Sequence, residues 1–229
     1  MELKHYIYLV ALALLFLIFL IFGLNRKLAI RQGIKYIIPS VVISGAIFLM
    51  FEFRFVEFNI WKYNPDYLSG IFLFRIPLEE WLVYIVLPLT GYLVYELVHA
   101  VVYKTGNPNY YVVLSLILLV VFIVTTYTCR KLTYTFVIFL LLSVYFGYIV
   151  FRGQLKPHYG FFYISFLFSL VPFFFLNAFI VGLPVILYNP HYISGVSVIK
   201  IPLENIAGFF LLFLMNISIY EYLMEKRFY

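Results

Sequence analysis

The sequence predicts an all-α integral membrane protein of about seven transmembrane helices, built as two parallel three-helix repeats joined by a linker helix. Three observations predict this class. The composition is 65% hydrophobic and 11% charged, whereas soluble domains are about 45–50% apolar. Several uncharged runs, such as residues 6–24, reach the roughly 20 residues that cross a bilayer core. One long segment of the chain also recurs at a fixed offset.

Each expected helix is a largely uncharged run that stops where charged or turn-forming residues resume. The first run exceeds the apolar region of a signal peptide and lacks a small-residue cleavage site, so we interpret it as a retained helix. The third and seventh runs begin at Pro77 and Pro202, and proline suits the first turn of a helix. The expected spans are residues 5–24, 35–54, 77–98, 109–128, 132–151, 160–182 and 202–223.

Two long connections are copies of each other. Residues 63–80 read YNPDYLSGIFLFRIPLEE and residues 188–205 read YNPHYISGVSVIKIPLEN, with ten of eighteen positions identical at an offset of 125. The same offset aligns Tyr95-Glu96 with Tyr220-Glu221. Three spans reverse the direction of the chain and a fourth restores it, so we expect parallel repeats. The expected units are residues 1–105, the linker helix at 106–130 and residues 131–229.

The net charge of +6 comes from basic residues dispersed in short interhelical segments, which does not favour nucleic-acid binding. We interpret these residues as topology determinants. The more basic set of alternate loops includes the C-terminus, which predicts a cytoplasmic C-terminus. This set is Arg26, Lys27, Arg31, Lys35, Lys104, Arg152, Lys156, Lys226 and Arg227.

The sequence contains few signals for a cofactor. Cys129 is the single cysteine, which excludes an intramolecular disulfide and a thiolate metal cluster. The four histidines lack the i, i+4 spacing of a helical metal site, so we expect no metal. No G-x-G-x-x-G segment or P-loop occurs, which argues against a nucleotide cofactor. A single Asp also excludes the Asp-rich magnesium-diphosphate motif of membrane prenyltransferases.

The acidic residues near membrane depth are the main functional candidates, because burying an ionisable group there costs at least about 2.5–3.5 kcal/mol. Glu52 closes the second span while Glu79 and Glu80 open the third, so all of them should lie near one membrane face. Asn177, Glu204 and Asn205 are their counterparts in the second repeat. Glu96 and Glu221 fall near the opposite face, where we expect them to be interfacial.

A simpler interpretation of the repeated Ile-Pro-Leu-Glu is a helix start, in which Glu complements the helix dipole. That interpretation explains neither the repeated long loop nor the doubled acid at Glu79-Glu80. Arg75 and Lys200 precede the motifs by four residues, where they either bias a carboxyl or snorkel to the interface.

These residues resemble the membrane lycopene cyclases of the heterodimeric and fused type, whose marker is a P-x-E-[ED] segment opening a helix in each half. Pro77-Leu78-Glu79-Glu80 fits that marker fully, whereas Pro202-Leu203-Glu204-Asn205 departs at the last position. The resemblance covers nearly the whole chain. It implies cyclisation of the ends of lycopene to β-ionone rings, giving γ-carotene and then β-carotene, without a cofactor. It also implies a carotenoid substrate and a multi-pass protein of the cell membrane.

Such chemistry requires one acid, one base and a dry cavity. On this view Glu79, crowded by Glu80 and Glu52, is the protonated general acid, and Glu204 beside Asn205 is the base. The two roles can also be exchanged. Asn177 is expected to support the site.

Two other functions remain open from the sequence. A transporter of the SWEET type shares the 3+1+3 arrangement, but it carries Pro-Gln pairs within its spans and needs a polar pore. The two glutamines here, Gln32 and Gln154, both lie outside the expected spans. A membrane terpene cyclase acting on another polyene is the second alternative.

Overall fold

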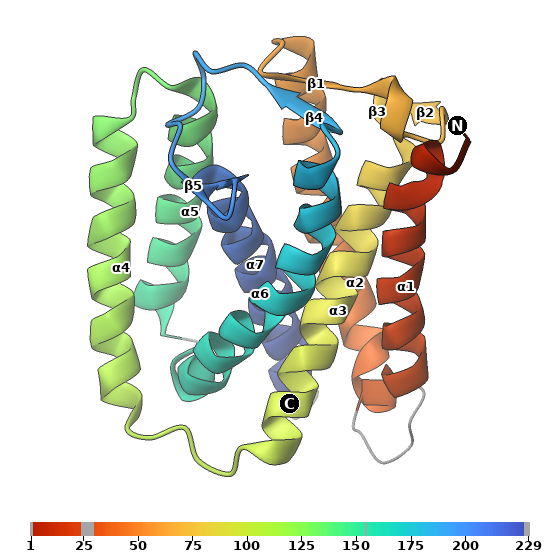
Figure 1. The fold of residues 1–229 in the computed structure, drawn as a ribbon. Helices are drawn as coiled ribbons and strands as arrows, with labels where there is room; N and C mark the ends of the chain where they lie inside the picture. Colours follow the sequence, from red (N-terminus) through yellow and green to blue (C-terminus); the bar gives the residue numbers. More distant parts are fainter. Residues whose placement is uncertain (1, 24–29, 154, 227–229) are drawn as a thin grey trace.

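The computed structural model describes residues 2–23, 30–153 and 155–226, and seven of its helices are long and apolar enough to cross a membrane (Figure 1). The predicted class is therefore confirmed. The helices are α1 (Ile7–Gly23), α2 (Ile30–Glu57), α3 (Leu78–Val101), α4 (Pro108–Thr128), α5 (Thr133–Arg152), α6 (Tyr159–Gly182) and α7 (Leu203–Glu225). Short 3-10 turns η1 (Glu2–Tyr6), η2 (Pro65–Tyr67) and η3 (Lys156–His158) adjoin them.

The helix limits follow from local signals. Pro77 and Pro202 lie immediately before α3 and α7, with extended backbone that cannot continue a helix backwards. The Asn107 side chain accepts a hydrogen bond from the Asn109 amide (3.0 Å) and caps α4. Gly153 adopts the left-handed conformation that ends α5.

The two repeats run in the same direction. In Figure 1, α1 and α5 both descend from the end of the bundle that holds the strands, and α3 and α7 do the same. The expected parallel arrangement is visible in this order. Helix α4 lies at the edge of the bundle, packs mainly on α5 and exposes apolar side chains outward, as a linker helix in lipid should.

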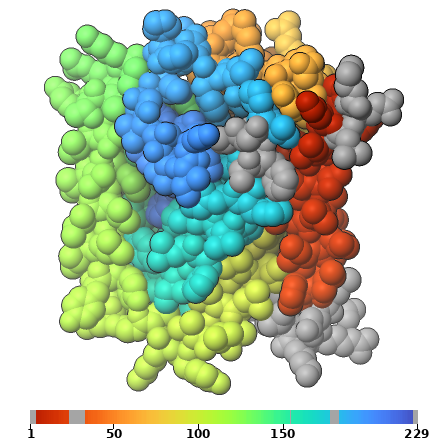
Figure 2. All heavy atoms as spheres, viewed as in Figure 1, coloured from red at the N-terminus to blue at the C-terminus, as the bar shows by residue number. Residues whose placement is uncertain are grey.

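Short strands in the two long loops were not predicted. They are β1 (Trp61–Tyr63), β2 (Phe72–Leu73) and β3 (Ile76–Pro77) in the first loop, and β4 (Ile186–Tyr188), β5 (Ser197–Val198) and β6 (Ile201–Pro202) in the second. Strand β1 pairs with β4 in antiparallel register, with Trp61 opposite Tyr188. The equivalent loops of the two repeats are thus hydrogen-bonded to each other across the end of the bundle, and the second loop covers that end above α6 (Figure 2).

Each loop also forms a tight hairpin with the same unusual turn. The turn residues have positive φ: 51° and 66° at Phe74 and Arg75, and 51° and 65° at Ile199 and Lys200. Two-residue turns of this kind favour Asn-Gly, and a β-branched residue with positive φ is a steric outlier. Strain of this sort persists where the surrounding structure over-determines it, here immediately before the helix starts at Leu78 and Leu203.

Helix α7 forms the centre of the molecule. It packs against α2 and α5, and almost every side chain from Ala207 to Ser218 is buried. Helices α2 and α5 both contact α7 but pack little against each other, which leaves room for a cavity between them.

The described basic residues of the predicted cytoplasmic set lie at or near the end of the bundle opposite the strands. They include Lys35, Lys104, Arg152, Lys156 and Lys226. Arg26, Lys27 and Arg227 lie outside the described residues. The cytoplasmic orientation of this end stays a prediction.

Candidate active site

An apolar cavity of about 500 Å³ lies between the two repeats near the strand-bearing end. Its volume falls within the range of small-molecule sites. Helices α2, α3, α5, α6 and α7 and the β1–β4 pair all contribute to its wall. Its aromatic lining consists of Tyr8, Phe48, Phe51, Phe55, Trp61, Tyr84, Tyr134, Tyr145, Tyr148, Phe173, Tyr188 and Phe209.

Two carboxyl groups from the first repeat face this cavity. Glu52, near the end of α2, is 4% exposed and accepts hydrogen bonds from the hydroxyls of Tyr63 and Tyr84. Glu80, in the first turn of α3, is 5% exposed and accepts a hydrogen bond from Tyr8 (3.0 Å). Buried carboxyls are retained where neighbours hydrogen-bond them. Each of these acids is therefore held in place by phenols while lining an apolar space.

The second repeat places amides at the equivalent positions. Asn177 in α6 donates to the Phe173 carbonyl (2.9 Å), and Asn205 in α7 donates to the Tyr188 hydroxyl (2.7 Å) and accepts from Tyr134 (3.0 Å). Both line the same cavity. The site is thus pseudo-symmetric in geometry but not in chemistry, because a side-chain amide does not act as a general acid or base at neutral pH.

Glu79 and Glu204 are hydrogen-bonded to the two long loops. Both are fully buried, and each accepts a hydrogen bond from a loop amide ten residues earlier, Ser69 and Ser194 respectively, at 2.7 Å. The Thr135 hydroxyl also donates to Glu204 (2.5 Å). Neither carboxyl lines the cavity. Each therefore fastens its hairpin loop to the start of the following helix.

The sequence assigned Glu79 as the acid and Glu204 as the base of one site, with Glu80 beside Glu79, but of these three only Glu80 lines the cavity. The reason is helical geometry, since consecutive residues on an α-helix point about 100° apart. When Glu80 faces the cavity, Glu79 points in another direction, and here it accepts its hydrogen bond from the loop. Glu52, Asn177 and Asn205 do lie at the cavity, as expected.

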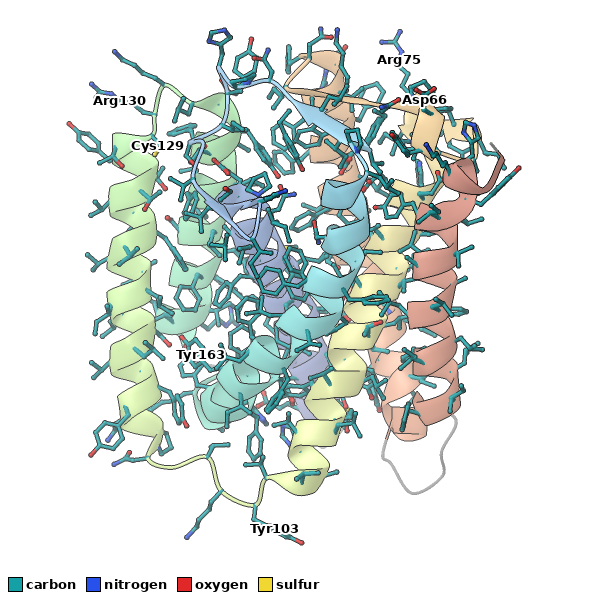
Figure 3. The ribbon with its side chains drawn as sticks, viewed as in Figure 1. Asp66, Arg75, Tyr103, Cys129, Arg130 and Tyr163 are labelled. Carbon is teal, nitrogen blue, oxygen red and sulfur yellow. The ribbon has the colours of Figure 1, made fainter. Side chains whose placement is uncertain are left out.

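Arg75 and Lys200 do not reach a carboxyl. Both lie exposed at the tips of their hairpins, and Arg75 points away from the bundle (Figure 3). Each basic residue lies in the turn itself, and an extended strand, β3 or β6, separates it from the helix start, so a separation of four residues does not bring the side chains together. Among the described residues, neither forms an ion pair. The interpretation that they change the protonation of a nearby carboxyl is therefore not supported. Their exposure agrees with the other interpretation, in which they lie at the membrane–water interface.

Tyrosines are the functional side chains that the sequence did not single out. Burial and the Glu52 carboxylate raise the pKa of the Tyr63 phenol well above its usual value, and burial likewise raises the pKa of Tyr188. Both phenols therefore remain protonated; the Tyr63 hydroxyl donates to Glu52, and the Tyr188 hydroxyl accepts from Asn205. Tyr63 and Tyr188 are the first residues of the repeated block, and this position could have marked them as site residues. No sequence feature distinguished Tyr8 or Tyr84 among the 22 tyrosines.

The cavity reaches the outer surface of the bundle between α2 and α5. Its lining includes Ile47 on α2 and Val144 and Tyr148 on α5, which are 37%, 65% and 50% exposed. Because these side chains belong to spans, the surface that they expose faces lipid. A long apolar molecule can therefore enter the cavity sideways from the bilayer.

Comparison with known proteins also finds two repeats in the chain. A family model described as lycopene cyclase matches it twice, over residues 5–98 and 130–223. These two matches coincide with helices α1 to α3 and α5 to α7 and leave α4 between them. Neither the curated proteins nor the solved structures that were compared gave a match.

Proposed function

The chain belongs to the lycopene cyclase family, and on that premise we propose that it closes the acyclic ends of lycopene to β-ionone rings in the cavity between its repeats. The observation that supports this most directly is the pair of buried, phenol-bound carboxyls, Glu52 and Glu80, in an aromatic cavity. The expected products are γ-carotene and then β-carotene. The membrane is proposed to be the cell membrane.

The reaction needs only proton transfer and exclusion of water. A proton adds to the terminal alkene and leaves a tertiary carbocation, which the neighbouring internal double bond attacks to form the ring bond. The positive charge moves to the next tertiary carbon, and loss of a ring proton to a base restores an alkene. The molecular formula does not change, so no oxidant or reductant is consumed.

We assign Glu80 as the proton donor and Glu52 as the acceptor. Two phenolic donors hold Glu52 and stabilise its charged form, whereas Glu80 has one. Two carboxyls in one apolar cavity also favour a state in which only one is ionised. The proton returns from Glu52 to Glu80 before the next turnover. This assignment replaces the pair Glu79 and Glu204, whose carboxyls are directed at loop amides.

The aromatic wall supports a cationic intermediate. Trp61 lies at the centre of a ring cluster, with centroids 5.1 Å from Phe55, 5.0 Å from Tyr134 and 5.9 Å from Tyr188. The faces of such rings attract a cation by about 0.5–2 kcal/mol each when water is excluded. A transporter cavity for a polar solute would instead need a largely polar wall.

Among the described residues, the cavity has one such acid pair, because Asn177 and Asn205 occupy the equivalent positions of the second repeat. We therefore propose that each binding event cyclises one end of lycopene. The rest of the polyene extends into lipid through the opening between α2 and α5.

Expression in a lycopene-accumulating bacterium tests the function. Chromatography of the extracted pigments should show γ-carotene and β-carotene at the expense of lycopene. Purified protein in liposomes should perform the same conversion without added flavin or nicotinamide. Unchanged lycopene in both assays, from protein shown to be inserted, would refute the proposal and favour a transporter or a cyclase of another polyene.

A further inference from the structure

The end of the bundle opposite the cavity contains a second polar cluster. Tyr95 of α3 donates to Glu221 of α7 (2.5 Å), and Tyr220 of α7 donates to Glu96 of α3 (2.8 Å). These reciprocal bonds join the two repeats. They lie about 24 Å along the helices from the cavity carboxyls, because Glu80 and Glu96 are 16 residues apart. The cluster is therefore separate from the proposed cyclisation site.

Two histidines lie beside Glu221, whereas among the residues that the structure describes the equivalent Glu96 lacks such neighbours. The Nδ1 atom of His158, in η3, lies 3.6 Å from the nearer carboxylate oxygen of Glu221. His99, in the last turn of α3, contributes a third ligand-type atom, and all three atoms lie within 4.8 Å of one another. At the offset of the repeat, the counterparts of His158 and His99 are Gly33 and Met224. Glu96 therefore has no equivalent pair of histidines.

The three groups have unused binding capacity. The Nε2 atom of His99 is buried and has no hydrogen-bond partner among the described residues. In the described part of the chain, Glu221 has no Lys or Arg partner, since its ion pair is with His158. A buried ring nitrogen without a partner calls for an explanation, and metal coordination is one.

We propose that His99, His158 and Glu221 form a binding site for a divalent transition-metal ion of the Zn²⁺ type. Two imidazoles and one carboxylate are an established donor set for zinc, with bond lengths of about 2.0–2.2 Å. Ligands at that distance lie about 3.4 Å apart in a tetrahedron, so small side-chain rotations from the present separations complete the site. The Tyr95 hydroxyl orients the carboxylate from outside the coordination shell, as metal ligands commonly require.

The metal would join α3 of the first repeat to η3 and α7 of the second. Its site shares no residue with the cavity, so the proposal does not depend on the cyclase assignment. The expected consequence is stabilisation of the interface between the repeats, because a ligand that binds only the folded state shifts unfolding.

The test uses full-length protein purified in detergent without a histidine tag and stripped with a chelator. Titration with Co²⁺ should produce the visible absorption of a tetrahedral site at one equivalent, and Zn²⁺ should abolish it by displacement. Glu221→Gln, His158→Ala and His99→Ala should lose the absorption. Tyr95→Phe should keep it with roughly 10- to 100-fold weaker affinity.

Matched variants control for general damage. Glu96→Gln removes the pseudo-symmetric carboxylate, and His191→Ala removes an exposed histidine in the second loop. Both should bind Co²⁺ like the wild type. Zn²⁺ should raise the melting temperature of the wild type and of Glu96→Gln but not that of Glu221→Gln, which retains the shape of the side chain. No absorption in the wild type, or unchanged binding in Glu221→Gln, would overturn the proposal.

Discussion

At the residue scale, neighbouring acids in one motif have different tasks. Glu79 and Glu80 are adjacent, yet Glu79 accepts a hydrogen bond from a loop amide while Glu80 faces the cavity. The second repeat keeps the loop-binding acid as Glu204 and places Asn205 at the cavity. A shared motif therefore combines a structural residue with a residue of the site.

We expect Glu80→Gln and Glu52→Gln to insert normally and to lose cyclisation by about 10²- to 10⁴-fold, because each removes a proton-transfer group without changing its shape. Pigment chromatography of lycopene-accumulating cells measures the loss. Glu57→Gln is the matched control for Glu52→Gln, since Glu57 is an exposed acid on the same helix, α2. Its carboxylate is paired with Arg54 (2.8 Å). Wild-type pigment from Glu80→Gln would contradict its assignment as the acid.

Glu204→Gln should retain activity, because the amide oxygen can still accept the hydrogen bonds of Ser194 and Thr135. Glu204→Ala should lower the free energy of unfolding by about 1–3 kcal/mol, since it leaves buried donors without an acceptor. Thermal unfolding and pigment analysis of the same preparations separate the two effects. A folded Glu204→Gln that accumulates lycopene would return the catalytic role to this carboxyl.

At the scale of elements, the packing of loops and helix pairs determines where the cavity is open to lipid. The β1–β4 pair lines the cavity at its strand-bearing end, whereas α2 and α5 leave its side open to lipid. The equivalent helix pair of the other side, α1 and α6, packs together. In the described part of the chain, the entrance therefore lies on the side of α2 and α5, and the other side is packed.

Narrowing this entrance should slow conversion. Val144→Trp adds bulk at a cavity-lining position that is 65% exposed, and we expect a several-fold slower conversion of lycopene with an unchanged melting temperature. Rates in liposomes measure the effect. Val124→Trp, at a 54% exposed position on α4 away from the cavity, is the control and should match the wild type. Equal rates for both variants would place the entrance elsewhere.

At the scale of the whole molecule, two similar halves enclose the cavity, and the acids that line it in the described part of the chain are Glu52 and Glu80. In the second half, Asn205 is hydrogen-bonded to Tyr134 and Tyr188, and neither it nor Asn177 can supply the proton for cyclisation. Duplication thus provides the enclosure, and divergence restricts the chemistry to one side.

A single acid pair predicts a free monocyclic intermediate. With limiting enzyme in liposomes, γ-carotene should exceed the enzyme concentration before β-carotene appears, because the substrate must leave and re-enter with its other end. A time course resolved by chromatography checks this order. β-Carotene formed from the start, with no pool of γ-carotene, would show that both ends react in one binding event.

Much of this molecule could be predicted from its sequence because the determining physics is local or periodic. Apolar runs of bilayer length specify the helices, and a fixed offset of 125 residues specifies the parallel repeats. The same offset, with the positions of helix ends, predicted that six polar residues gather near one membrane face. Glu52, Glu80, Asn177 and Asn205 line the cavity there, whereas Glu79 and Glu204 do not.

Only the tertiary structure decided which face each side chain takes. A one-residue step rotates a helical side chain by about 100°, so Glu79 and Glu80 could not be distinguished before the packing of α3 was known. The pairing of β1 with β4, the phenols from α1 and α3, and the meeting of His99 with His158 and Glu221 all join residues far apart in the chain. Such contacts arise from how the helices pack, and neither hydropathy nor a repeat offset contains that information.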